Sequence, residues 1–91
     1  MEKMLAENEI AQALKKVPGW KRREKEISRH YTFSGFIAAM AFVNHVADLA
    51  EKMDHHPDIL IEDKKVTLTL STHSAGGLTE LDFTLARKID A

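Results

Sequence analysis

The chain has 91 residues, with 13 Lys or Arg against 14 Asp or Glu, so its net charge is close to neutral. This length fits one domain, residues 1–91, with a single thin core. The charge balance argues against DNA or RNA as a direct partner. The absence of cysteine excludes a disulfide framework and thiol catalysis, and it fits a reducing cytoplasm.

Two further observations argue against export and against a membrane partner. The start, "MEKMLAENEIAQALKK", is charged throughout and has no apolar segment typical of a signal peptide. The longest apolar stretch, residues 36–50, is too short and too polar to span a bilayer. We therefore expect a cytoplasmic protein.

The first third of the chain predicts a helix and then a β-hairpin. Apolar residues at helical spacing, ended by Pro18 and Gly19, predict a helix over about residues 7–16. Trp20 follows as an expected core anchor and begins a short strand, residues 20–22, with a turn near Glu24. The partner strand shows alternation, in which one face carries Ile27, Arg29, Tyr31 and Phe33.

The middle of the chain predicts a long helix that begins at Ser34 as its N-cap and ends near Met53. Two apolar rows run along this helix, and its polar face is narrow. A helix that covers one sheet in a small monomer should have a wider polar side. We therefore expect a homo-oligomer in which this helix contacts a second subunit.

The last part of the chain predicts a second hairpin and a final helix. "DILIE" and "KVTLTLST" flank a turn at Asp63 and Lys64, and Thr79 is the expected N-cap of the final helix. The predicted order is α-β-β-α-β-β-α. This order indicates an α+β fold, with a four-stranded antiparallel sheet and helices packed on one face.

Three histidines are placed by this fold at one end of the sheet. His55 and His56 follow the long helix, which Pro57 prevents from continuing, and His73 follows the last strand. The second hairpin brings these positions back toward each other. Neighbouring imidazoles can supply one acid and one base near neutral pH, and Asp54 is a candidate to orient one of them.

Structural and metal-binding roles are the alternatives to proton transfer for these residues. A histidine at a helix end is often a cap, and no function is assigned to His30 or His45. Asp82 lies three residues after Thr79 and fits a capping box. A zinc site made of the three histidines with Asp54 or Glu51 is the main chemical alternative, although adjacent histidines chelate one ion poorly.

At these positions the sequence resembles the pterin-4a-carbinolamine dehydratase family over almost its whole length. The shared features are Glu51 before "HHP" (residues 55–57), "LSTH" (70–73), the small-residue loop "SAGGL" (74–78) and Asp82. The resemblance implies elimination of water from a 4a-hydroxytetrahydropterin to give quinonoid dihydropterin, which recycles the tetrahydropterin. It implies no metal and no organic cofactor, and a dimer or tetramer built through helix and sheet-edge contacts.

The resemblance also implies the site residues. His55, His56 and His73 would be catalytic. Glu51, Asp54, Ser71 and Thr72 would contact the pterin, with the backbone of residues 71–73 holding its amide edge. Asp82, Trp20 and Pro57 would be structural or support the histidines. The chain departs from the usual family pattern at Asp63, Ser74, Ile59 and Leu60, which affects substrate fit more than chemistry. A non-catalytic interaction module on the same fold is the alternative function.

Overall fold

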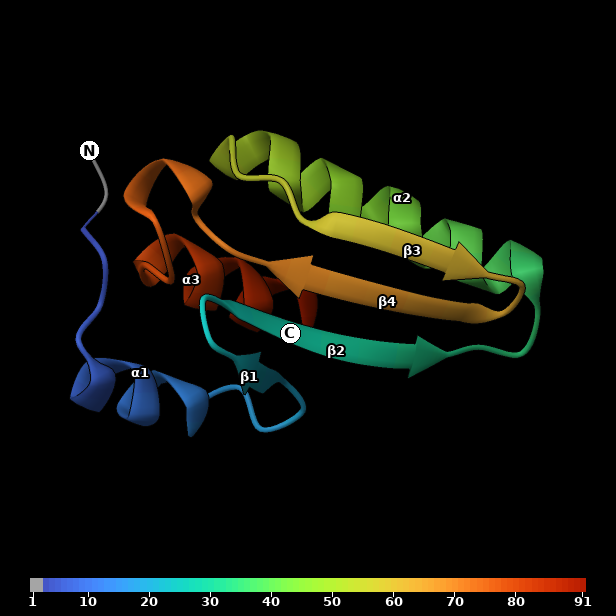
Figure 1. The fold of residues 1–91 in the computed structure, drawn as a ribbon. Coiled ribbons are helices and arrows are strands. Elements are labelled where there is room, and N and C mark those ends of the chain that lie inside the picture. Colours follow the sequence, from blue (N-terminus) through green and yellow to red (C-terminus); the bar gives the residue numbers. More distant parts are fainter. Residues whose placement is uncertain (1–2) are drawn as a thin grey trace.

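The computed structural model describes residues 3–91, and Figure 1 shows an antiparallel sheet backed by helices. The predicted α-β-β-α-β-β-α order is confirmed. The elements are α1 (Glu7–Leu14), β1 (Lys21–Arg23), β2 (Glu26–Thr32), α2 (Phe36–Met53), β3 (Asp58–Glu62), β4 (Lys65–Leu70), the 3-10 turn η1 (His73–Ala75) and α3 (Glu80–Ile89).

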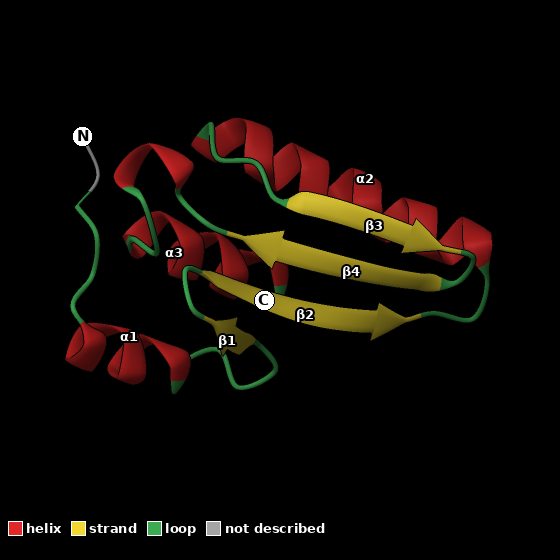
Figure 2. Cartoon of the chain, in the orientation of Figure 1, coloured by secondary structure: helices red, strands yellow, loops and turns green. Residues whose placement is uncertain are grey.

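The four strands pair in the order β1-β2-β4-β3, and every pair is antiparallel (Figure 2). The turns fall at the predicted places, where Glu24 and Asp63 adopt left-handed backbone conformations with φ of 53° and 57°. Alternation then divides each strand between two faces. On β4 the apolar residues are buried, while Thr67 and Thr69 lie on the opposite face.

The core lies between the sheet and the helices α2 and α3, which lie on the same side of it (Figure 1). Phe83 and Leu85 of α3 are fully buried there. Helix α1 lies at the β1 end of the sheet and adds Ile10 to the core. Trp20 is 4% exposed, which confirms it as a core anchor, and its indole N–H donates to the Asp90 carboxylate at 2.8 Å.

The start of α2 differs from the prediction by one residue. Gly35, not Ser34, is the N-cap, and no side chain caps the helix there. The Gly35 carbonyl accepts the first helical hydrogen bond, from the Ala39 amide at 3.1 Å. The backbone of Gly35 is still extended, so the helical turn begins only after it. Helix α1 is also shorter than expected and ends at Leu14.

The helix α2 is predominantly apolar but is interrupted by polar side chains. Of the described residues, 3–91, no helix combines the length and the apolar character needed to cross a bilayer.

Candidate functional site

Three segments of the chain meet at one end of the sheet. The C-terminal end of α2, the start of β3 and the η1 loop lie together there (Figure 1). The cause is the antiparallel pairing of β3 with β4, which sets Asp58 opposite Thr69. The chain just before β3 therefore returns to the level at which β4 ends. This is the arrangement that the second predicted hairpin required.

The end of α2 directs His55 into the protein. Asp54 ends the helix in a left-handed conformation, with φ 50° and ψ 44°, and the His55 amide donates back to the Ala50 carbonyl at 3.0 Å. Such a reversal turns the chain sharply after the last helical residue. As a result the Asp54 side chain is exposed, whereas His55 is 8% exposed.

The partner of His55 is Asp82, a residue of α3. Its Oδ1 lies 2.7 Å from His55 Nε2, and the Asp82 side chain is fully buried. The prediction that Asp54 orients an imidazole is therefore corrected for His55. Asp54 is the nearer carboxylate in the sequence, but its left-handed backbone leaves it exposed to solvent.

Asp82 also confirms the predicted capping box of α3. Its Oδ2 accepts the Thr79 amide at 2.9 Å, and the Thr79 hydroxyl oxygen accepts the Leu81 amide at 3.2 Å. The same Oδ2 accepts the hydroxyl of Thr72 at 2.9 Å. One buried carboxylate thus joins the start of α3, the end of β4 and His55.

The directions of these hydrogen bonds follow from the donors available. Thr72 gives its only hydroxyl proton to Asp82, so the 2.8 Å contact between the two threonine hydroxyls must be donated by Thr79. An ionised carboxylate only accepts, so His55 Nε2 carries a proton toward Asp82. The other nitrogen, Nδ1, is the atom of His55 that Asp82 does not contact.

His56 is exposed to solvent and contacts a different carboxylate. Its Nε2 lies 2.5 Å from Oε2 of Glu51, a residue in the last turn of α2. Glu51, which was expected to contact the pterin, is therefore the carboxylate that contacts His56. The two adjacent histidines consequently have different environments, one buried against Asp82 and one exposed beside Glu51.

His73 is exposed and begins η1, directly after Thr72. Thr72 and Gly77 close this loop with two backbone hydrogen bonds of 3.1 and 3.3 Å. The Thr72 amide donates to Gly77 and its hydroxyl donates to Asp82, which leaves no donor on Thr72 for a ligand. Ser71 donates its hydroxyl to the Lys25 carbonyl at 2.7 Å. Both residues expected to contact substrate thus also hold the loop.

The structure places the other two histidines elsewhere. His30 contacts the Thr67 hydroxyl through Nδ1 at 2.8 Å, on the face of the sheet that the helices leave open, and His45 is on an exposed part of α2. Within residues 3–91, no group of three His, Cys, Asp or Glu side chains is arranged to hold a metal ion. The ligand set required by the zinc alternative is therefore not assembled among the residues that the structure describes.

The sequence did not predict the hydrogen bond between Asp82 and His55, nor the hydrogen bond that Thr72 donates to the other oxygen of Asp82. The available signal was the capping-box spacing of Thr79 and Asp82, which predicted a buried carboxylate at the start of α3. The spacing does not reveal that the second oxygen of that carboxylate faces a histidine from 27 residues away.

Comparison with known proteins identifies the family of the chain. The model of the family described as pterin 4 alpha carbinolamine dehydratase matches residues 3–91. A Thermomicrobium roseum protein named "Putative pterin-4-alpha-carbinolamine dehydratase" is 54% identical over 80 residues, which are 88% of this chain and 86% of that protein. A Nocardia farcinica protein of the same name is 53% identical over 87 residues, covering 96% and 92% of the two chains.

Two solved structures share the fold. A Brucella melitensis protein titled "transcriptional coactivator/pterin dehydratase" superposes with a TM-score of 0.92 at 39% identity, covering 97% of this chain and 96% of that one. A pterin dehydratase-like protein, identified as a RuBisCO assembly factor in the alpha-carboxysome, has a TM-score of 0.63 over 78% of this chain and 82% of its own. At 22% identity the second supports the fold alone. By its sequence and its fold, this chain belongs to the pterin 4 alpha carbinolamine dehydratase family.

Proposed function

We propose that the chain is an enzyme that eliminates water from a 4a-hydroxytetrahydropterin, giving quinonoid dihydropterin and thereby recycling the tetrahydropterin cofactor. The observation that carries this proposal is the buried pair of His55 and Asp82, at the end of the sheet that also carries His56 and the His73 loop. A protein that only bound a partner would have no need for a buried imidazole held by a buried carboxylate.

The chemistry requires one acid and one base. A protonated imidazole gives its proton to the 4a-hydroxyl, the C4a–O bond breaks, and water leaves. The N5 lone pair forms the new bond to C4a, and a neutral imidazole accepts the proton that the ring loses. Such positioned proton transfer contributes about 10² to 10⁴ in rate. No metal and no organic cofactor takes part in this proposal.

The histidines divide these roles. We assign the two transfers to His55 and His73, with Nδ1 of His55 as its exchanging atom because Asp82 occupies Nε2. His56, whose Nε2 contacts Glu51, is assigned to substrate binding. Asp54 is exposed next to the same pair and is proposed as a further polar contact for the pterin.

The loop after β4 supplies the rest of the binding site in this proposal. The backbone of residues 71–73 is proposed to hold the amide edge of the pterin. Because the Thr72 amide already donates to Gly77, that contact falls to Ser71 and His73. Thr72 supports the site through Asp82 instead.

The test is a stopped-flow dehydration assay with synthetic 4a-hydroxytetrahydropterin. Replacing His55 or His73 by Ala should lower kcat by about 10² or more, because each change removes one transfer. The double variant should lose less than the product of the two losses, since both groups serve one transition state. His56→Ala should act mainly on KM.

Two controls accompany this test. His30→Ala and His45→Ala should keep the wild-type rate, because neither residue lies at this end of the sheet. The wild-type rate should also fall on both sides of an optimum pH, because one imidazole must be protonated and the other neutral. Wild-type turnover by folded His55→Ala and His73→Ala proteins would refute the assignment.

We further propose that the protein is a homo-oligomer, a dimer or a tetramer. The support is two sets of apolar side chains that one chain leaves uncovered: Phe36 and Ile37 on α2 are 51% and 80% exposed, and Leu60 on the edge strand β3 is 54% exposed. An edge strand and an apolar helix face are both surfaces that a second copy can cover. A cytoplasmic location stays a prediction from the sequence.

The same exposed apolar side chains suit the alternative function, a non-catalytic interaction module. The relative from Brucella melitensis bears a title that combines coactivator and dehydratase, so one fold is associated with both. The two functions differ in the assay above. A binding module would show no acceleration of dehydration over the uncatalysed rate, and its histidine variants would behave like the wild type.

A further inference from the structure

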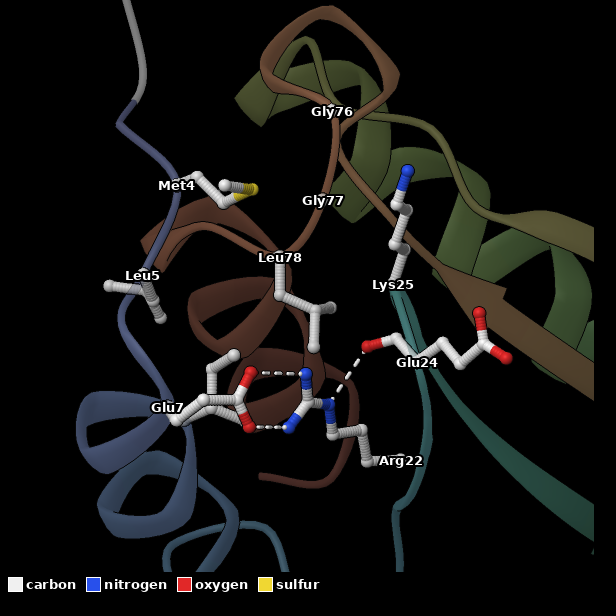
Figure 3. Close-up of a pocket in the computed structure, with 10 residues that line it drawn as sticks. Met4, Leu5, Glu7, Arg22, Glu24, Lys25, Gly76, Gly77 and Leu78 are labelled. Carbon is white, nitrogen blue, oxygen red and sulfur yellow. Dashed lines mark hydrogen bonds and ion pairs between the residues drawn. The ribbon is translucent and has the colours of Figure 1, made fainter.

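The loop that carries His73 is held at both of its ends by parts of the chain that precede β2. At its start, the Ser71 hydroxyl donates to the carbonyl of Lys25, in the turn between β1 and β2. At its other end, the Leu78 carbonyl accepts the amide of Leu5 at 2.8 Å. Residues 3–6, here called the strap, therefore run past the far side of the loop, as Figure 3 shows.

The strap fits closely against the second end of the loop. A side-chain carbon added at Gly77 would lie 2.8 Å from the sulfur of Met4, so the Met4 side chain lies directly against Gly77. Leu5 packs partly buried against the core, and Leu78 is 1% exposed. The strap is thus in contact with the residue, Gly77, whose two backbone hydrogen bonds to Thr72 close the loop.

Arg22 links the two supports. Its two terminal nitrogens donate to the two carboxylate oxygens of Glu7, at 2.6 and 2.9 Å, and Glu7 is the first residue of α1, directly after the strap. Its Nε donates to the Glu24 carbonyl at 2.8 Å, in the turn that holds Ser71 through Lys25. One planar guanidinium can make this three-point contact, and a lysine cannot.

A cavity of about 330 Å³ separates the two supports, and its wall includes Arg22, Met4, Gly76 and Gly77 (Figure 3). The outer side of the loop is consequently not packed solidly against the protein. Gly76 has a left-handed φ of 80° and nothing near the position of a side-chain carbon. A loop of this kind has room to open unless its ends are held.

We propose that Arg22 is a positioning residue, which acts through the strap and the β1–β2 turn to keep the His73 loop in its closed conformation. This inference rests on the proposed function, because the benefit of a fixed loop is a fixed His73. Arg22 itself is not proposed to touch the substrate. Its effect on turnover passes through His73 alone.

The first measurement is amide hydrogen exchange, which needs no substrate. In Arg22→Gln the Gly76 and Gly77 amides should exchange about threefold to tenfold faster, the factor expected when a partly exposed ion pair and one hydrogen bond are lost. Amides of β4 should be unchanged, which separates loop opening from general destabilisation. In Arg22→Lys the Gly76 and Gly77 amides should exchange at rates between those of the wild type and of Arg22→Gln. Lysine keeps the positive charge but lacks the planar guanidinium that contacts both oxygens of Glu7.

The matched control is Arg23→Gln. Arg23 is the neighbouring arginine of the same strand, it is exposed, and alternation places its side chain on the other face. A second variant, Met4→Ala, perturbs the strap without changing a charge and should also raise exchange at Gly77. Equal exchange at Gly76 and Gly77 in Arg22→Gln and Arg23→Gln would overturn the proposal.

The second measurement connects the loop to the reaction. In the dehydration assay Arg22→Gln should lower kcat at least twofold, whereas in a His73→Ala background it should have no further effect. An equal loss in both backgrounds would show that Arg22 does not act through His73 and would overturn the proposal. If the wild type itself has no dehydratase activity, the proposed function fails, while the exchange measurements still show whether the loop is held.

Discussion

Asp82→Asn is the substitution that most directly tests how His55 is held. The change conserves shape but replaces one carboxylate oxygen by an NH₂ group. Oδ2 accepts both the Thr79 amide and the Thr72 hydroxyl, and Oδ1 faces His55 Nε2. In one orientation the new NH₂ group meets the buried Thr79 amide, which can only donate. In the other it faces His55 Nε2, which must lose its proton to Nδ1 before it can accept.

The size of the effect follows from burial. Asp82 is fully buried, and each buried donor that loses its acceptor costs about 1–3 kcal/mol. Partial loss of the α3 cap adds about 0.5–2 kcal/mol. We expect the free energy of unfolding to fall by about 2–4 kcal/mol, which lowers Tm by roughly 10–25 °C in a domain of this size.

The assays are thermal unfolding followed by circular dichroism, and dehydration kinetics at a temperature where the variant is folded. kcat should fall about tenfold or more, because His55 remains but is no longer held in one tautomer and orientation. Glu80→Gln is the control, since Glu80 is an exposed acidic residue of the same first turn. It should cost about 0.3–1 kcal/mol through the helix dipole and leave kcat unchanged.

A double-mutant cycle with His55→Ala completes the test. Residues in one hydrogen-bonded network show interaction energies of about 0.5–3 kcal/mol. The cost of Asp82→Asn should therefore be smaller in the His55→Ala background. If Asp82→Asn lowers stability no more than Glu80→Gln and keeps full turnover, the carboxylate does not hold His55 and our account of the site is wrong.

Three further predictions concern assembly, metal dependence and high pH. Light scattering at micromolar concentration should give a multiple of the 10.3 kDa chain mass. Ile37→Asp should reduce the measured mass without unfolding the chain, because Ile37 is 80% exposed. A charge at Val43, or at Phe42, whose ring centroid lies 4.5 Å from that of Tyr31, should also disturb the fold. A 10.3 kDa species alone would exclude the oligomer. Exhaustive chelation should leave turnover unchanged, and stoichiometric zinc whose removal abolishes activity would favour the metal alternative. Burial, and to a smaller extent the hydrogen bond to Asp90, raises the pKa of Tyr31, which is the single tyrosine of the chain. Absorbance at 295 nm should therefore show no tyrosinate in the folded protein at about pH 10, the pH at which a tyrosine of the unfolded chain titrates. The neutral phenol is thus favoured by folding, and stability should fall as pH rises above about 10; folded-state titration at the ordinary pKa would contradict this.

Local patterns in the sequence were sufficient for the elements and for their order. Alternation predicted both hairpins, and the turns at Glu24 and Asp63 are where it placed them. The Thr79 and Asp82 spacing predicted the capping box that begins α3. These features depend on residues within a few positions of one another, so the chain encodes them before it folds. The hairpin also placed the histidines at one end of the sheet, and the family motif identified them as a group.

The tertiary structure alone decided which partner each group contacts. Asp54 is next to His55 in the sequence, yet the left-handed end of α2 leaves it exposed, and the packing of α3 against α2 brings Asp82 to the imidazole instead. In the same way, Trp20 meets Asp90 across 70 positions, and Arg22 meets Glu7 across 15. Such contacts depend on how whole elements pack and on the direction of each side chain at the contact. Periodicity and spacing in the sequence describe one element at a time, so they predict neither how the elements pack nor which side chains meet.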